Sequence, residues 1–390
     1  MASRAWPKAA PSDPAGGRDG EACPARLEAR DWRGVECNAA FLTAWADLAN
    51  HASEPNPFNE QWALLPALTA HDSAGRCELL SLDSDGELHG LMPIARRGLY
   101  YRYPLPHLQN WMHGNAFCGM PLVRTGHERQ FWQALFDWAD RRAGTALFLH
   151  LTHLDEGGPL FAALRDVANS QHRAAAVVHR EERALLHSQL SPQDYLDASM
   201  SGKKRKELRR QHRRLAEEGK LEFARQIDAS GLGPWTDEFL LLEKAGWKGS
   251  NGSALACSSD TDAMFRATLA GAAEAGRLER LRLSLDGKPI AMLANFITPP
   301  GAFSYKTAYD EDYARFSPGV LLQRENLDLL DNPAIDWCDS CASADHPMID
   351  RIWREKRAMV RVSIAIGGSA RQALCRQILR REAGTELRGL

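Results

Sequence analysis

The second half of the chain begins with apolar residues at helical spacing and then changes to apolar runs at strand spacing. Ser191 and Pro192 have the residue types that favour an N-cap and a first helical position, so we expect the second folded region to start there. Asp286-Gly287 is the pair expected at a tight turn between two strands. The pattern predicts helices over residues 203–218, 234–245, 260–275, 319–330 and 347–357, and strands over 221–227, 278–285, 290–297, 303–309, 335–339 and 359–366.

The first half shows the same two kinds of pattern in a more mixed order. Phe131, Leu135 and Trp138 fall on one side of a predicted helix. Turn residues at 83–86 separate two strand-like runs of unequal length, which is typical of a hairpin. Helices are predicted over residues 38–49 and 128–142, and strands over 77–82, 87–96 and 146–151. Helices and strands are therefore interleaved in this half.

The length of 390 residues predicts two folded cores, because single cores stop growing near ~250–300 residues. With the boundary near residue 190, we expect an N-terminal domain over residues 28–189 and a C-terminal domain over residues 190–370. Residues 1–27 are rich in Ala, Pro and Gly and predict a disordered tail. Residues 371–390 are expected to form a C-terminal helix or tail.

Charge and cysteine content exclude few classes of protein. A formal net charge of -2 gives no overall attraction to nucleic acid or to a membrane, so any such attraction must be local. The eight cysteines are irregularly spaced, which favours free thiols in a reducing, cytoplasmic compartment. No run approaches the ~18 apolar residues of a spanning helix. We therefore expect a cytoplasmic protein, with peripheral binding to the inner membrane as the alternative.

Six short segments carry more specific residue patterns. They are Asn56-Pro-Phe-Asn-Glu-Gln-Trp62, Glu243-Lys-Ala-Gly-Trp-Lys-Gly249, Tyr305-Lys-Thr-Ala-Tyr-Asp-Glu-Asp-Tyr313, Phe316-Ser-Pro-Gly-Val-Leu-Leu322, Cys338-Asp-Ser-Cys341 and Ile349-Asp-Arg-Ile-Trp353. Through these segments the chain, above all residues 195–370, resembles the bacterial acetyltransferase family known as CelD/BcsL-like, a relative of the FemAB peptidoglycan transferases. The resemblance implies an α/β (α+β) fold of two tandem GNAT-like domains, with mixed, mostly antiparallel sheets flanked by helices and a degenerate first domain.

The resemblance also implies an activity. It points to an N-acyltransferase that moves an acyl group from acyl-CoA, the donor substrate, onto an amine, without a metal. The acceptor is expected to be a small molecule or a lipid amine, such as a long-chain base in a reaction like that of a ceramide synthase, or an envelope or exopolysaccharide precursor. The alternatives are an aminoacyl-tRNA-dependent transferase like the FemAB proteins and a non-catalytic accessory protein of polysaccharide synthesis.

The loop Ser317-Pro318-Gly319 is the predicted site for the donor. Backbone N–H groups at a helix N-terminus attract an anionic pyrophosphate, and glycine lets a phosphate approach the backbone closely. We expect Ser317, Pro318, Gly319 and Val320 to bind the cofactor, with Arg315 as the neighbouring cation. The alternative is that Ser317 and Pro318 only start a helix.

Four residues are candidates for catalysis near the same place. Lys306 and Tyr309 lie on the strand before the loop, Asp339 ends the next predicted strand, and His346 follows it. Lys306 could orient a substrate carbonyl or phosphate, while Asp339 or His346 could accept a proton from the amine. Each has an ordinary alternative: a solvated strand lysine, a turn carboxylate, an exposed loop histidine.

Two further segments are candidates for substrate binding. Trp247 and Lys248 belong to one of the family-like segments, and Trp111 and His113 lie in the Gly-containing loop 110–121, which would either line a pocket or pack under an interface. Cys338 and Cys341 form a CxxC pair without a second pair, which favours packing over metal or redox chemistry.

Residues 203–214 hold eight Lys and Arg residues. A solvated helix face is the ordinary interpretation of such a run, but the excess of cations also suits cofactor phosphates, anionic lipid headgroups or RNA. Because no aromatic residues are interleaved for base stacking, nucleic acid is the less favoured partner, and an anionic membrane surface is the favoured one.

Overall fold

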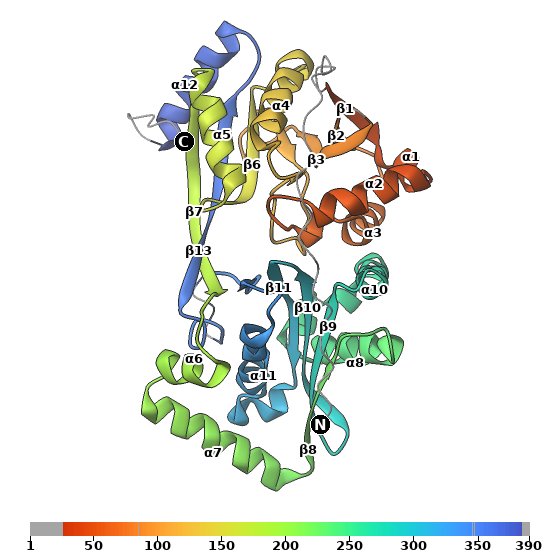
Figure 1. The fold of residues 1–390 in the computed structure, drawn as a ribbon, viewed down its shortest axis with the longest axis vertical. Helices are drawn as coiled ribbons and strands as arrows, with labels where there is room; N and C mark the ends of the chain where they lie inside the picture. The colour runs from red at the N-terminus through yellow and green to blue at the C-terminus, as the bar shows by residue number, and fades with distance from the viewer. Residues whose placement is uncertain (1–25, 85, 345, 347, 384–390) are drawn as a thin grey trace, which may run out of the picture.

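The computed structural model describes residues 26–84, 86–344, 346 and 348–383. Within these residues, thirteen strands form one sheet that runs through both halves of the molecule (Figure 1). Twelve strands follow the order β1-β2-β3-β4-β6-β13-β7-β12-β11-β10-β9-β8, and β5 pairs with β3 beside this path. The strands are β1 (Arg26–Asp31), β2 (Cys77–Ser84), β3 (Glu87–Arg97), β4 (His107–Asn110), β5 (Leu122–Val123), β6 (Phe148–Asp155), β7 (Ala175–Leu186), β8 (Leu221–Gln226), β9 (Leu278–Leu285), β10 (Lys288–Thr298), β11 (Gly301–Tyr309), β12 (Trp337–Asp339) and β13 (Glu355–Ala365).

Helices cover both faces of the sheet. In the second half, α8 and α10 pack on one face, and α11 packs on the other together with α6 and α7 (Figure 1). The α-helices are α1 (Trp32–Glu36), α2 (Ala39–Asn50), α3 (Gln61–His71), α4 (Glu128–Arg142), α5 (Pro159–Ser170), α6 (Pro192–Ser199), α7 (Gly202–Glu218), α8 (Leu232–Ala245), α9 (Trp247–Ser250), α10 (Ser259–Glu274), α11 (Pro318–Asn326) and α12 (Ser369–Ala383). Short 3-10 helices are η1 (Pro57–Asn59), η2 (Leu255–Cys257), η3 (Glu311–Phe316) and η4 (Leu327–Asp331).

The three-strand meander β9-β10-β11 forms the predicted antiparallel unit. Asp286 and Gly287 both have positive φ, 49° and 80°, as the expected tight turn requires. The predicted α+β class, with a mostly antiparallel sheet flanked by helices, is confirmed.

The sheet is continuous because β13 and β7 join its two halves. β13 lies between β6 and β7, and β7 pairs with β12 through Leu185 and Leu186. The strand predicted at 359–366 therefore pairs with strands of the first half, although it follows the second half in sequence.

The two halves also share a core, which explains the segment 56–62. The Phe58 ring contacts the rings of Phe296 and Tyr305 from the second half, and Trp62 stacks edge-on against Phe296. The side chain of Asn56 donates hydrogen bonds to backbone carbonyls of the loop 110–121. This segment therefore fixes the first half onto the meander of the second.

The structure corrects several predicted elements. Leu27 is buried in β1, so residues 26 and 27 do not belong to a tail; residues 1–25 of the predicted tail and 384–390 of the predicted C-terminal segment lie outside the described residues. The predicted helix 347–357 is wrong: the described residues 348–354 form turns and irregular structure, and β13 begins at Glu355. The helix predicted to end at residue 330 changes into the 3-10 helix η4 at Leu327.

Candidate functional site

The candidate site is a cleft where two neighbouring strands separate. β11 and β12 run parallel and pair only between residues 301–303 and 337–339, after which they diverge. A cleft of about 750 Å³ opens between them. Its walls are the rest of β11, the start of α11, Trp247 and Lys248, the tip of the loop 110–121, and the segment that follows β12.

The N-terminus of α11 forms one wall of the cleft. Ser317 has φ 54° and ψ 53°, and its carbonyl accepts hydrogen bonds from the N–H groups of Val320 and Leu321. Pro318 has no N–H, so Gly319 supplies the first-turn donor without an intrahelical acceptor. A Cβ on Gly319 would meet the sulfur of Met348 at 2.5 Å, so packing also requires glycine there. Ser317, Pro318, Gly319 and Val320 all line the cleft, as a donor site requires.

Lys306 lies on β11 inside the cleft. Its Nζ donates to Oδ1 of Asn115 at 2.6 Å and lies 5.5 Å from the centroid of the Phe117 ring. Burial and, to a smaller extent, the charge of Lys248 lower the pKa of Lys306 to about 8. Lys306 is thus an ammonium group at pH 7 that can lose its proton at moderately alkaline pH.

Trp247 and Lys248 lie at the rim of the cleft beside β11, where the Nζ of Lys248 donates to the carbonyl of Thr307 at 3.4 Å. The Nζ of Lys248 donates to Oε1 of the buried Glu243 at 2.8 Å, and Trp247 is 54% exposed. Glu243 also accepts from the N–H of Leu255, so the cation is held by a fixed carboxylate. Both residues therefore present a cation and an aromatic ring to a bound molecule, as a substrate-binding role would need.

His346 and Tyr309 are the remaining predicted catalytic residues that line the cleft. The Nδ1 of His346 is buried and has no hydrogen-bond partner among the described residues. Burial lowers the pKa of His346 below its ordinary value, so its imidazole is neutral at pH 7 and can accept a proton. Tyr309 stands beside the start of α11, with its ring 3.5 Å from the position of a Cβ on Gly319.

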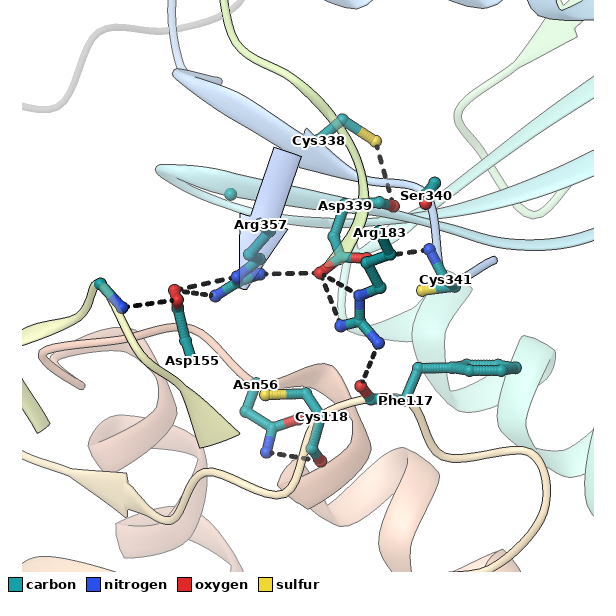
Figure 2. A network of polar contacts seen from close by, with 12 residues as sticks. Asn56, Phe117, Cys118, Asp155, Arg183, Cys338, Asp339, Ser340, Cys341 and Arg357 are labelled. Carbon is teal, nitrogen blue, oxygen red and sulfur yellow. Dashed lines mark hydrogen bonds and ion pairs between the residues drawn. The ribbon is translucent and has the colours of Figure 1, made fainter. Parts of the chain in front are cut away.

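Asp339 does not line the cleft, contrary to its predicted catalytic placement. Figure 2 shows its carboxylate between two arginines: Oδ2 accepts from Arg183 at 2.6 Å and 3.0 Å and from Arg357 at 2.9 Å. Burial alone would raise the pKa of Asp339, but the two guanidinium charges outweigh burial and hold the pKa below its ordinary value. A fully buried carboxylate held in this way has no access to an amine, and its role is structural.

The arginines of this cluster extend it to the first half. Arg183 donates to the carbonyl of Phe117 at 2.7 Å, and Arg357 donates to Asp155 at 2.9 Å (Figure 2). The cluster thereby holds the loop whose Asn115 binds Lys306.

The CxxC pair consists of buried thiols. Cys338 and Cys341 are both free, and burial raises the pKa of each well above its ordinary value. Neither is a thiolate at neutral pH, which favours packing over redox chemistry.

Besides Asp339, three predicted site residues lie outside the cleft. Arg315 is 68% exposed at its side chain and pairs with Glu218 of α7 at 3.0 Å. Trp111 and His113 line a second hollow on the other side of the loop 110–121. The loop therefore takes part in both hollows, while Arg315 faces away from the donor site.

Sequence reasoning missed Asn115, Phe117 and Glu243 as parts of the site. Asn115 and Phe117 lie in a loop that the sequence singled out, but nothing local indicates that they meet Lys306, 191 residues away from Asn115. Glu243 lies in one of the family-like segments, three residues before Gly246, and its pairing with Lys248 could have been inferred from their close spacing.

Known protein families and solved structures resemble this chain in sequence pattern and in fold. Residues 202–346 match the model of the acetyltransferase (GNAT) domain. The solved structure of FemX resembles the chain with a TM-score of 0.55 at 10% identity, covering 87% of this chain and 97% of that one. A conserved protein of unknown function from Bacteroides thetaiotaomicron VPI-5482 gives a TM-score of 0.53 at 12% identity, covering 87% of this chain and 99% of that one. No curated protein sequence matches the chain significantly.

At these identities the two solved structures show a common fold and nothing finer. The matched domain model agrees with the separated strands and with the helix that starts at the cleft. The predicted resemblance is confirmed. Residues 202–346 match the acetyltransferase (GNAT) domain, within a chain whose fold is similar to that of FemX.

Proposed function

We propose that the protein is an acyl-CoA-dependent N-acyltransferase whose cleft between β11 and the segment after β12 holds both reacting groups. The observation that carries this proposal is the joint position of the α11 N-terminus and Lys306 in one cleft of about 750 Å³. An anion-attracting helix end and a buried cation there suit the pyrophosphate and the thioester carbonyl of one extended donor.

The separated strands support the placement of the donor. Beyond Phe303, β11 does not pair with β12, so the backbone of Tyr305 and Lys306 borders the cleft where an extended amide-containing arm could lie, while the carbonyl of Thr307 accepts from Lys248 at 3.4 Å. The pantetheine arm of coenzyme A has such amides, and the N–H of Gly319, which has no intrahelical acceptor, is the donor that would meet the phosphates at the end of this arm.

The chemistry needs few groups, because a thioester is already activated and proximity supplies much of the rate. The amine nitrogen attacks the carbonyl carbon, an N–C bond forms, and the C–S bond breaks. The ammonium of Lys306 stabilises the oxyanion of the intermediate, and neutral His346 accepts the proton that the amine loses. The hydroxyl of Tyr309 returns a proton to the leaving thiolate, so the products are an amide and free coenzyme A.

The proposal also includes a class of acyl acceptor. An amine on a lipid, such as a long-chain base, suits a protein that reaches an anionic membrane surface through the cations of residues 203–214. In the described residues, no helix has the length and apolar character needed to cross a bilayer, so such contact would be peripheral.

The test is amine-dependent release of coenzyme A thiol from donors ranging from acetyl- to palmitoyl-CoA. We expect His346→Gln to slow release by about 10²–10⁴-fold, the usual contribution of a general base, with unchanged donor affinity. The exposed His179→Gln is the matched control and should behave as wild type. If no donor releases thiol and RNA copurifies with the protein, the aminoacyl-tRNA alternative replaces this proposal. Absence of both would favour the accessory-protein alternative.

A further inference from the structure

A second hollow of about 520 Å³ lies on the other side of the loop 110–121 from the cleft. The end of α3, the end of β3 and residues 111–114 form its walls. Arg76, Arg96 and Arg97 line it together with His71 and His113. We name it the arginine pocket.

The positive charge of the arginine pocket is not neutralised by the protein. Among the described residues, Arg76 and Arg97 make no side-chain hydrogen bond or ion pair, while Arg96 donates to the carbonyls that end α4. Asp72 is the acid that lines the pocket, and its carboxylate accepts from the Trp32 side chain and from the N–H groups of Arg76 and Cys77. Two guanidinium groups therefore remain available to an anion from solution.

The arginine pocket adjoins the reaction cleft. Gly114 lines both hollows, and its neighbour Asn115 holds Lys306. The rings of His113 and His71 stack with their centroids 5.1 Å apart. Burial, with smaller contributions from His71 and from the charge of Lys306, lowers the pKa of His113 to about 3. A side chain at Gly114 would meet no atom within 4 Å, so open space surrounds this point of contact.

We propose that the arginine pocket binds an anionic group of the acyl acceptor, a phosphate monoester or a carboxylate, while the acceptor's amine reaches Lys306 past Gly114. Guanidinium groups bind both anions through paired N–H donors, which suits Arg76 and Arg97. The neutral imidazoles of His71 and His113 line the passage and add no positive charge against an amine. This inference rests on the proposed function, since it assigns an acceptor class to the same reaction.

Binding of an anion in the arginine pocket can be tested without acyl transfer. Phenyl phosphate and benzoate are titrated calorimetrically into protein saturated with coenzyme A, so that the anion site of the donor is already filled. We expect Arg76→Gln/Arg97→Gln to weaken binding of the preferred anion at least about tenfold, as for lost charge-assisted hydrogen bonds. The control Arg376→Gln/Arg380→Gln removes two exposed arginines of α12 and should change nothing.

Preference for phenyl phosphate or for benzoate decides between the two anions. Failure of both to bind wild-type protein, or equal binding by the double variant, would overturn the proposal. This readout needs no acyl transfer, and the Arg76→Gln/Arg97→Gln variant still separates the arginine pocket from the cleft if coenzyme A does not bind, so it is distinguishable from a failure of the proposed function.

The passage past Gly114 is tested by Gly114→Leu. The added side chain should leave coenzyme A and phenyl phosphate affinities unchanged but lower kcat/KM for an acceptor carrying both an amine and the preferred anion at least about tenfold, through lost positioning. Gly34→Leu is the control, because Gly34 also has no atom within 4 Å of an added Cβ. Undiminished turnover by Gly114→Leu would overturn the connection between the two hollows.

Discussion

At the scale of single residues, Lys306 is the side chain whose surroundings say most about chemistry. Burial, with the nearby charge of Lys248, lowers its pKa to about 8, while Asn115 fixes its position. The group remains protonated at pH 7 and can stabilise an oxyanion, but it loses that ability as the pH rises through about 8.

This titration predicts the alkaline side of the pH profile. With one acceptor throughout, kcat/KM of the wild type should fall above about pH 8 relative to Lys306→Arg, because a guanidinium stays protonated. Lys306→Gln should lose about 10²–10³-fold at every pH, the usual effect of removing an oxyanion donor. Identical alkaline limbs for wild type and Lys306→Arg would show that Lys306 does not act as a cation.

Individual site residues could be predicted where they belong to a short segment with a family-like residue pattern. Lys306 and the loop 317–320 belong to such segments, and the structure brings them into one cleft. Asp339 shows the opposite case: a carboxylate at the end of a strand looks the same in sequence whether it faces a cleft or two arginines. Its partner Arg183 is 156 residues away, so only the fold could reveal the pairing.

At the scale of elements, α7 presents most of its cations to solvent. Leu208 and Leu215 form its buried side, as its sequence predicted. Arg205 pairs with Asp197 and Arg210 with Glu207, whereas Lys203, Lys204 and Lys206 make no ion pair with described residues. Arg209 and Arg214 are likewise exposed and make no ion pair with described residues, so these five cations are the ones of α7 available to an anionic surface.

Membrane binding through α7 can be tested at the three lysines that lie together at the start of this helix. Lys203→Gln/Lys204→Gln/Lys206→Gln should reduce flotation with anionic liposomes at low salt, since each cation near such a surface contributes about 1 kcal/mol. Removing Arg376, Arg380 and Arg381 of α12 in the same way is a control of equal charge. Equal flotation of the α7 variant and the wild type would exclude α7 as the membrane contact.

Most helices and strands of the second half were predictable from periodicity. The exception is the helix predicted over residues 347–357, and it has a physical reason. Ile349, Ile352 and Trp353 have helical spacing and are all buried, with 3%, 0% and 1% exposure. Here the chain buries them from a turn-rich segment, which satisfies the same apolar pattern without a helix. The strand β7 was missed because the middle of Ala175–Leu186 is polar and its pairing comes from β13.

At the scale of the whole molecule, the cluster of Arg183, Asp339 and Arg357 links β7, β12 and β13 where the two halves of the sheet meet (Figure 2). A continuous sheet could not be predicted from the sequence, because β13 inserts between strands that precede it by well over a hundred residues. The division into domains at residue 190 stays a prediction.

The cluster of Arg183, Asp339 and Arg357 predicts that removing the charge of Asp339 greatly lowers the stability of the fold. Asp339→Asn leaves the buried Arg183 without a carboxylate and Arg357 with Asp155 alone, and it should cost about 3–5 kcal/mol in the free energy of unfolding, measured with denaturant. The exposed Asp331→Asn is the control. Because the folded pKa of Asp339 is lowered, its contribution is present above the unfolded pKa of about 4 and is lost as the pH falls below that value. A loss under about 1 kcal/mol would contradict the structural role.

The central claim is that coenzyme A binds with its pyrophosphate at the start of α11. Gly319 packs against Met348, so a substitution there would disturb folding as well as binding. Ala314 is a better probe, because its side chain is exposed and it lines the cleft beside Ser317. An acid at this position places negative charge beside the phosphates without entering the core.

Calorimetric titration of coenzyme A into wild type, Ala314→Gln and Ala314→Glu tests this claim most directly. The account predicts binding by wild type and by Ala314→Gln with similar affinity, and at least about tenfold weaker binding, roughly 1.4 kcal/mol, by Ala314→Glu with unchanged melting. No binding by the wild type, or equal affinity of Ala314→Glu and Ala314→Gln, would contradict it.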